Sequence, residues 1–189
     1  MHEIEPFYGW LDYYNSEEDA YSPFYEVVHS EFQFQNKIYN YYIHPQWDYF
    51  GSNTLYLKLL YIDYEKSYAI IELIGEWNDA IYNDIMTLKR EIIDLLLEKG
   101  INKYVLLCGH VLNFHYSDDS YYEEWREDIE DGWVVLLDVA PHVEVEMQKK
   151  GLGRHLFFGS EFNNYTWRKL NPEYLIEAID AQLSKKLGM

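Results

Sequence analysis

The fold of this chain is decided by residues 133–158, which read WVVLLDVAPHVEVEMQKKGLGRHLFF. This stretch has two interpretations that lead to different functions. Counted in twos, His142, Glu144 and Glu146 share one face of a strand, where imidazole and carboxylate groups would form a metal or acid/base site. Counted in turns of 3.6 residues, the segment 142–150 is a short helix, in which Glu144 points away from the other two side chains.

The residues around this segment favour the helix. Pro141 is well placed for a first helical turn, and Val143 and Met147 are four residues apart, so they share a helix face. Lys149 precedes Gly151, which is typical of a helix end. The stretch is therefore predicted as a strand, a helix and a strand, at residues 133–139, 142–150 and 154–160.

The same alternation of elements extends towards the N-terminus. A helix beginning at Asn78 or Asp79 has a stripe of apolar residues, namely Ile81, Ile85, Leu88, Ile92 and Leu95, and Gly100 follows it. Strand, helix and strand in this order imply a right-handed crossover and a parallel pairing. The other predicted elements are a hairpin over residues 54–77, a strand over 103–109, a helix within 120–132 and a C-terminal helix over 171–188.

Residues 1–53 have a different character from the predicted α/β domain, residues 54–189. They are aromatic and acidic, are interrupted by prolines and have no helical stripe, so we expect a loop-rich extension with short strands at Phe24–Phe34 and Ile38–Ile43. The chain has 20 tyrosines in all. We expect the aromatic residues of this extension to pack on the sheet, and a sugar-binding surface is the alternative.

The composition excludes some functions. A formal charge of -18 disfavours nucleic acid and anionic membranes as partners but leaves basic protein surfaces open. Cys108 is the only cysteine, which excludes an intrachain disulfide and a cysteine-based zinc site and fits a reducing, cytoplasmic location. We find no apolar run long enough to span a bilayer and predict no cofactor.

Three stretches carry a resemblance to a known family. Residues 68–92 run from a strand through Gly75 and an acidic turn into a long helix, residues 103–120 form a strand and a polar loop, and residues 133–158 have the order described above. Together they resemble the STAS domain of anti-sigma factor antagonists, over residues 68 to about 187. The resemblance implies a mixed α/β sheet with helices mainly on one face, and a non-enzymatic module that binds a protein such as an anti-sigma factor or a kinase.

In that family, an Asp-Ser-Ser-Gly run at the start of the second helix carries a serine whose phosphorylation breaks partner binding. The matching run here is residues 116–119, which puts Asp118 at the acceptor position, or residues 118–121 after a small shift. A fixed carboxylate supplies part of the charge of a phosphate permanently. The resemblance thus implies a divergent switch loop of Ser117, Asp118, Asp119 and Ser120, in which either serine is the acceptor if the switch survives.

The residues around this loop are the expected partner-binding surface. They are Phe114, Tyr116, Tyr121, Tyr122 and Trp125. The sequence leaves a homodimer open.

We identify no catalytic or metal-binding set, since Cys108 lies in an apolar strand and the glycines at 151 and 153 follow a helix instead of opening one. The enzymatic alternative is a small metal-dependent hydrolase that uses His110, His115 and Asp118 or Asp119.

Overall fold

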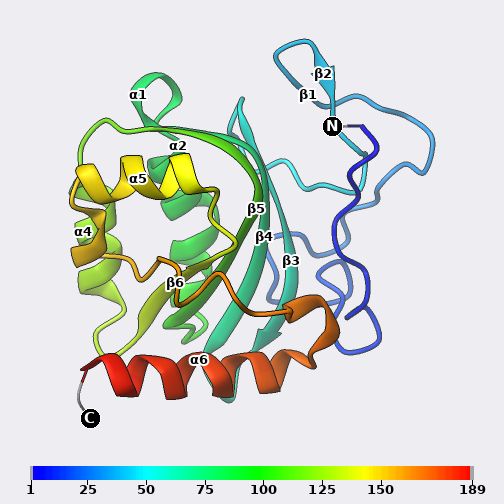
Figure 1. Ribbon diagram of the computed structural model, residues 1–189. Helices are drawn as coiled ribbons and strands as arrows, with labels where there is room; N and C mark the ends of the chain where they lie inside the picture. Colours follow the sequence, from blue (N-terminus) through cyan, green and yellow to red (C-terminus); the bar gives the residue numbers. More distant parts are fainter. Residues whose placement is uncertain (1, 188–189) are drawn as a thin grey trace.

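The centre of the protein is a four-stranded mixed sheet, seen in a computed structural model that describes residues 2–187 (Figure 1). Its strands are β3 (Leu55–Asp63), β4 (Tyr68–Asn78), β5 (Lys103–His115) and β6 (Trp133–Leu137), in the order β3-β4-β5-β6. The hairpin partners β3 and β4 are antiparallel, and the two other pairs are parallel. This confirms the predicted hairpin and parallel crossovers within an α/β fold.

One face of the sheet is covered by most of the helices. They are α1 (Asp79–Tyr82), α2 (Asp84–Leu88), the π-helical turn η1 (Lys89–Ile93), α3 (Asp94–Leu97), α4 (Ser120–Asp128) and α5 (Pro141–Lys149). Their apolar side chains, among them Ile85, Trp125 and Met147, pack on alternate residues of β4, β5 and β6 in one continuous core. The structure therefore confirms a helix at α5, and with it the choice of the helical interpretation.

The helix predicted over residues 78–99 is present but interrupted. Asn83 ends α1 in a left-handed conformation with φ of 52°, and η1 then widens the helix to a π turn. Asparagine tolerates this conformation better than most residues, because its short polar side chain adds little steric strain. The periodic stripe therefore predicts the buried face correctly at Ile85, Leu88 and Ile92, but it is wrong at Ile81 and Leu95, which are exposed. It does not predict the two irregularities.

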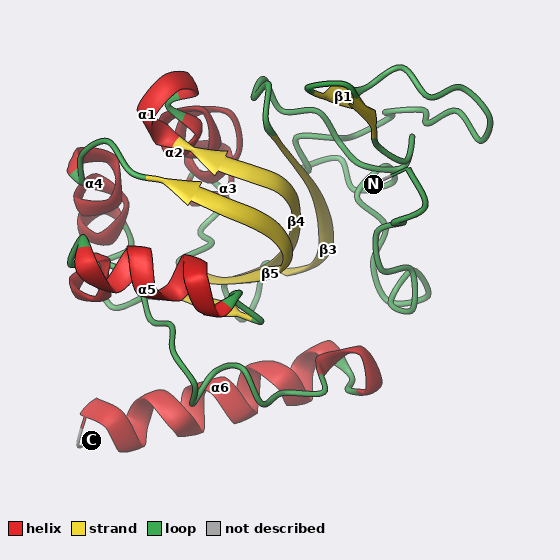
Figure 2. Ribbon diagram, turned by 45° about the horizontal axis from the view of Figure 1, so that its top comes forward, coloured by secondary structure: helices red, strands yellow, loops and turns green. Residues whose placement is uncertain are grey.

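The opposite face is covered by α6 (Pro172–Leu187) and by the N-terminal segment. Figure 2 shows α6 apart from the other helices. Leu175, Ile179 and Leu183 of α6 pack against Val105 and Leu107 of β5 and their neighbours, and Trp10 and Trp167 complete this second core. Helices thus lie mainly on one face, as predicted, and one helix lies on the other.

The N-terminal segment, residues 2–53, is called the arm below. Its hairpin, β1 (Lys37–Ile38) and β2 (Tyr41–Tyr42), overlaps the strand predicted at Ile38–Ile43, but a turn at Tyr39, with φ of 53°, makes two short strands of it. The strand predicted at Phe24–Phe34 is wrong, because the backbone turns there: Glu26 has φ of 59° and Val27 N donates to Phe24 O. The aromatic residues that suggested a strand are divided between the core, as for Phe24, and solvent, as for Phe32.

The last predicted strand, residues 154–160, is also wrong. Leu152–Arg154 is a 3-10 turn, η2, and Phe157 makes a single parallel bridge to Val135 of β6. Gly159 then has φ of 130°, which takes the chain away from the sheet edge.

No helix of residues 2–187 combines the length and the hydropathy that a membrane span requires.

Candidate functional site

The candidate site is the short loop that joins β5 to α4, residues 116–119. β5 continues to His115, well beyond the predicted end at residue 109, so the loop projects past the neighbouring strand β6 (Figure 1). Ser117, Asp118 and Ser120 are exposed, and Asp119 is half-buried. All four residues of the predicted switch loop therefore lie together at the carboxyl end of a parallel strand, where α/β proteins commonly place their binding sites.

Asp118 stabilises the start of α4. Its Oδ1 accepts hydrogen bonds from the backbone N of Ser120, at 3.1 Å, and from the Ser120 hydroxyl. Ser117 Oγ donates to the other carboxylate oxygen at 3.4 Å. The bonds from Ser120 lower the pKa of the Asp118 carboxyl below its ordinary value. The first turn of α4 thus has a fixed negative charge, which the helix dipole favours.

The chain that follows α5 holds the other side of the loop. Asp119 Oδ2 lies 2.7 Å from Arg154 Nη2 and 3.5 Å from His155 Nε2. Lys150 Nζ lies 5.3 Å from the centre of the Tyr116 ring, which is a cation–π geometry. Positive groups therefore neutralise Asp119 from one side and leave Asp118 facing solvent.

Three of the five predicted partner-binding residues are core residues. Phe114 is 7 % exposed, and Tyr122 and Trp125 are fully buried. Their side chains lie beneath the loop and are not accessible to a partner. The prediction that these three residues bind a partner is therefore wrong. Tyr116 and Tyr121 remain accessible in part, and the Arg90 guanidinium lies 5.4 Å from the centre of the Tyr121 ring.

A buried carboxyl group lies beneath the loop. Asp79 accepts hydrogen bonds from Tyr122 Oη at 2.7 Å, from Trp77 Nε1 at 3.1 Å and from Ile85 N at 2.9 Å. Burial raises the pKa of Asp79 to about 7, and the nearby Asp84 adds to the effect. The sequence indicated only a helix cap here. Asn78 makes that cap, since its side chain accepts from Ile81 N, and Asp79 turns inward.

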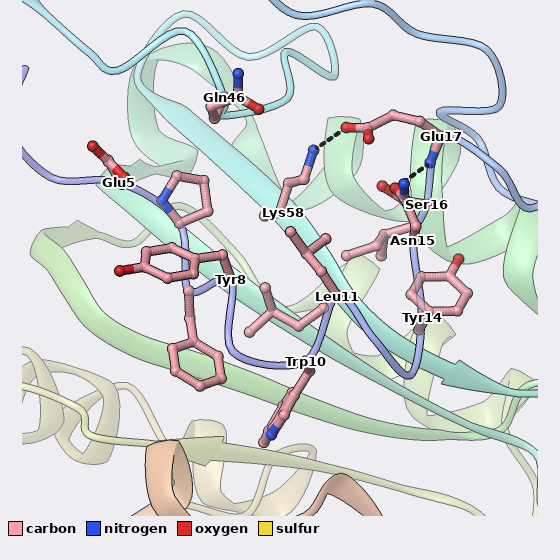
Figure 3. Close-up of a pocket in the computed structure, with 14 residues that line it drawn as sticks. Glu5, Tyr8, Trp10, Leu11, Tyr14, Asn15, Ser16, Glu17, Gln46 and Lys58 are labelled. Carbon is pink, nitrogen blue, oxygen red and sulfur yellow. Dashed lines mark hydrogen bonds and ion pairs between the residues drawn. The ribbon is translucent and has the colours of Figure 1, made fainter. Parts of the chain in front are cut away.

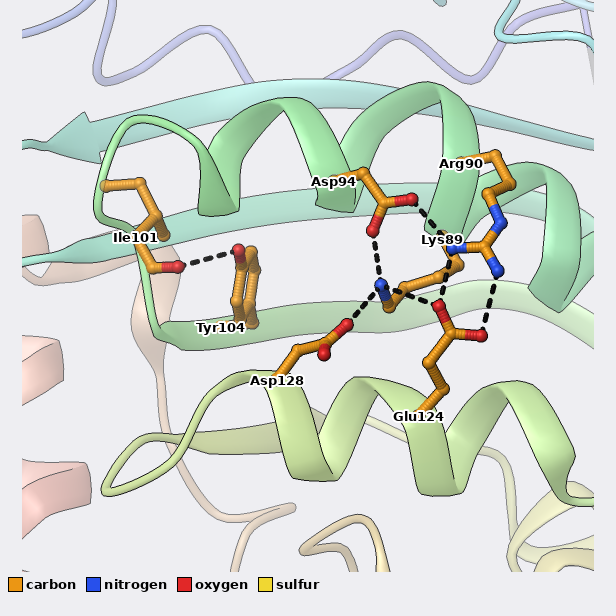
Figure 4. A network of polar contacts seen from close by, with 7 residues as sticks. All are labelled: Lys89, Arg90, Asp94, Ile101, Tyr104, Glu124 and Asp128. Carbon is orange, nitrogen blue, oxygen red and sulfur yellow. Dashed lines mark hydrogen bonds and ion pairs between the residues drawn. The ribbon is translucent and has the colours of Figure 1, made fainter.

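An ion network fixes α4 against the preceding helix (Figure 4). Lys89 is fully buried, and its Nζ contacts Asp94, Asp128 at 2.8 Å and Glu124 at 3.5 Å. Arg90 makes a bidentate pair with Glu124, at 2.5 and 2.8 Å. Because both cations come from η1 and two of the acids from α4, the helix that carries the loop is held at a defined position.

The residues of the hydrolase alternative do not converge. His110 Nε2 lies near Glu72 and Arg168, at 3.8 and 3.4 Å. His115 Nε2 lies 3.9 Å from Glu76, whereas Asp119 pairs with Arg154. Each of these groups has its own neighbours, so they form no shared site.

The other sequence candidates for chemistry have structural roles. His142 Nε2 lies 2.7 Å from Leu112 O, and Glu146 pairs with Lys149. Glu144 accepts from Gln148. Burial of Cys108 raises the pKa of its thiol, so the thiolate form that a nucleophile requires is disfavoured.

Two clusters of acidic and histidine side chains among residues 2–187 have ligand atoms close enough for one cation, Glu17 with His29 and Asp48, and Asp94 with Glu124 and Asp128. Each contains a lysine: the Lys58 ammonium lies within the first, and the Lys89 ammonium within the second. A lysine ammonium group therefore already lies among these carboxylates and offsets part of their charge.

Comparison with known proteins gives similarity to solved structures only. No family model and no curated protein sequence matches this chain. The anti-sigma factor antagonist SpoIIAA in its unphosphorylated form is 15% identical, with a TM-score of 0.47 over 66% of this chain and 96% of SpoIIAA. The phosphorylated form of the Bacillus cell fate determinant SpoIIAA gives 14% identity and a TM-score of 0.42, over 65% and 98% of the two chains.

A Thermotoga maritima protein provisionally assigned as an anti-sigma factor antagonist is 18% identical, with a TM-score of 0.40 over 54% of this chain and 82% of its own. These proteins belong to the group that the sequence resembles. The likeness is one of fold, over part of the chain and at low identity.

Proposed function

We propose that this protein is a non-enzymatic interaction module that binds another protein through the loop at residues 116–119 and the first turn of α4. The observation that carries the proposal is the arrangement of Asp118, whose exposed carboxylate is fixed by Ser120 at a helix N-terminus. The buried side chains beneath the loop and the Lys89 network fix the position of α4, the helix that follows this loop. A preorganised, exposed loop loses little entropy on binding.

We further propose that partner binding is independent of phosphorylation of this loop. The Ser120 hydroxyl is already bound to Asp118, so a phosphate on Ser120 would place a second anion beside that carboxylate. Ser117 is exposed and donates only a long bond of 3.4 Å, which leaves it as the better acceptor if the loop is modified. Asp118 supplies the negative charge in either case.

The expected partner is a protein with a basic surface. Asp118, Glu123 and Glu127 are exposed around the loop, and the chain as a whole has a formal charge of -18. Such a field speeds association with a positive surface and opposes pairing of two copies of this chain. Within the resemblance, an anti-sigma factor or a kinase is the partner to test first, and a homodimer is the alternative outcome.

A photocrosslinking experiment tests the location of the surface. A photoreactive amino acid is placed at Ser117, and in a matched protein at Tyr174, which is 66% exposed on α6. We expect a protein partner to be crosslinked in cells at position 117 and not at 174. Equal crosslinking at both positions, or at 174 alone, would contradict the proposed surface.

A second experiment tests the role of Asp118 with the captured partner. We expect Ser117→Ala and Ser120→Ala to bind nearly as tightly as the wild-type protein, and Asp118→Asn to bind about 5- to 10-fold more weakly, a loss of roughly 1 kcal/mol. Loss of binding on phosphorylation of either serine, with Asp118→Asn unchanged, would establish the family switch instead.

A further inference from the structure

A cavity of about 290 Å³ lies between the arm and the outer strand β3 (Figure 3). Arm residues 5–8, 10–11, 14–17 and 46 line one side, and Lys58 and Leu60 of β3 line the other. Leu60 and Trp10 belong to the core on the second face of the sheet, whereas α4 covers the first. The cavity is therefore separate from the candidate protein-binding loop.

The floor of the cavity is polar and contains a buried lysine. Lys58 is 7 % exposed, and its Nζ lies 2.6 Å from Glu17 Oε1 and 3.4 Å from Asp48 Oδ2. His29 Nε2 lies 3.3 Å from the same Nζ and 2.7 Å from Asp48 Oδ1. The charges at this end are thus paired with one another, which disfavours binding of a free anion or a metal ion.

Ser16 provides a hydrogen-bonding group with no partner. The residue lines the cavity and is 1 % exposed, and among residues 2–187 its hydroxyl has no hydrogen-bond partner. A buried hydroxyl without a partner costs free energy that a bound hydroxyl group would recover. Asn15 and Gln46 add amide groups to the same lining.

The walls of the cavity are aromatic. Trp10 is 3 % exposed, and its position is fixed because its Nε1 donates to Leu170 O at 2.9 Å. Phe7 packs edge-to-face on Trp10, with ring centroids 5.3 Å apart. Tyr8 is 69% exposed and forms the rim. The cavity thus combines ring surfaces with amide, hydroxyl and paired charged groups.

We propose that this cavity binds one neutral polyhydroxylated ring, a monosaccharide or a cyclic polyol. The apolar face of such a ring packs on aromatic side chains, and its hydroxyl groups both donate and accept hydrogen bonds, as the lining of Ser16, Glu17 and Lys58 requires. The volume lies at the lower end of the range for ligand pockets, roughly 300–1,000 Å³, which favours a single ring.

The test uses the intact protein and its intrinsic tryptophan fluorescence. Trp10 lines the cavity, and the centroid of its ring lies 5.6 Å from that of Trp167. The probes are glucose, galactose, mannose, ribose and myo-inositol, each to about 50 mM, since a single ring makes few contacts and millimolar dissociation constants are expected. Cyclohexanol, a ring of similar size with one hydroxyl group that does not fluoresce, is titrated in parallel as the mainly apolar probe. We expect at least one polyol to bind with saturation.

Two variants locate the binding. Tyr8→Ala removes an exposed rim residue and Ser16→Ala removes the unpaired hydroxyl, so neither change threatens the fold. We expect each to weaken polyol binding about 3- to 10-fold. Tyr13→Ala is the unchanged control, since Tyr13 is also exposed and does not line the cavity. Binding of cyclohexanol alone, no saturation with any polyol, or equal effects of all three variants would overturn the proposal.

Discussion

Glu72 in the inner strand β4 accepts a hydrogen bond at 3.0 Å from Arg168, a residue 96 positions further along the chain. The other oxygen of the same carboxylate accepts from the backbone N of Phe7 at 2.7 Å. Glu72 is 1 % exposed. One buried carboxylate therefore connects the arm and the segment before α6 to the sheet, and this explains a charged residue in a strand that is otherwise apolar.

Arg168→Ala is expected to destabilise the protein in a pH-dependent way. Burial raises the pKa of Glu72 above its ordinary value, and Arg168 opposes this rise. Without Arg168 the pKa rises further, so the folded state holds a proton that the unfolded state loses as pH increases above about 4.5. We expect a loss of about 1–3 kcal/mol at pH 8 and a smaller loss at pH 5, measured by urea unfolding.

Lys169→Ala is the matched control, because Lys169 is an exposed neighbour of the same charge. It should leave the free energy of unfolding within about 0.5 kcal/mol of the wild-type value at both pH values. A loss for Arg168→Ala that is the same at pH 5 and pH 8 would mean that Arg168 acts by packing and not by its charge.

Asp79 is expected to make stability fall as pH rises towards neutrality. Burial raises its pKa from an ordinary value of 3.8 to about 7, so between these values the folded state binds a proton that the unfolded state has lost. The free energy of unfolding should therefore decrease from about pH 4 to about pH 7, by on the order of 3 kcal/mol from this group. Asp79→Asn should remove this decrease, as measured by chemical denaturation across the range.

Trp77 gives an independent reading of the same group, since its Nε1 donates to the Asp79 carboxyl at 3.1 Å. Its fluorescence should titrate with an apparent pKa of about 7 in the wild-type protein and not in Asp79→Asn. Asp12→Asn, at an exposed position, should leave the titration unchanged. A titration that persists in Asp79→Asn would assign the proton to another group.

The elements that could be predicted from the sequence are those fixed by local pattern. Pro141 with Val143 and Met147 predicted α5, because a proline start and a four-residue apolar spacing act within one helix. The break at Asn83 and the π turn of η1 could not be predicted in this way, because the apolar stripe continues through both. The arm is the extreme case, since its course depends on contacts such as that of Phe7 with Glu72.

The candidate site could be predicted in position but not in detail. The polar run of residues 116–119 identified the loop. It could not show that Tyr122 and Trp125 face inward, because an apolar spacing on a short helix does not tell a core from an interface. Lys89 stands between Leu88 and Arg90 in the sequence, and its burial depends on carboxylates from α4 that lie far along the chain.

Lys89→Met is expected to destabilise the protein by about 1–2 kcal/mol, because it removes the buried cation shared by Asp94, Glu124 and Asp128, whose carboxylates are partly exposed. Lys185→Met, at an exposed position on α6, should have an effect below about 0.5 kcal/mol. Both are measured by urea unfolding. Adding Asp128→Asn to Lys89→Met should restore part of the lost free energy of unfolding, because one of the three mutually repelling carboxylates is removed. A further loss in the double variant would show that repulsion among these carboxylates is not the cause.

Gly75 is a position in β4 where the neighbouring chain leaves no room for a side chain. It has φ of 120°, and a Cβ atom there would lie 2.2 Å from the backbone oxygen of Thr54 and 2.5 Å from Ile38 Cδ1. That oxygen accepts from Glu76 N at 2.8 Å, so it cannot move without loss of a strand hydrogen bond. Gly75→Ala should therefore cost about 2–4 kcal/mol, from the clash and the backbone strain together.

Gly100→Ala separates these two causes. Gly100 also has a positive φ, 85°, but a Cβ atom there would meet nothing within 4 Å. The change carries the backbone strain alone and should cost about 1 kcal/mol. The difference between the two variants, measured by urea unfolding, reports the close contact of β4 with Thr54 and the arm hairpin. Equal losses would mean that Thr54 and Ile38 move aside to accept the methyl group.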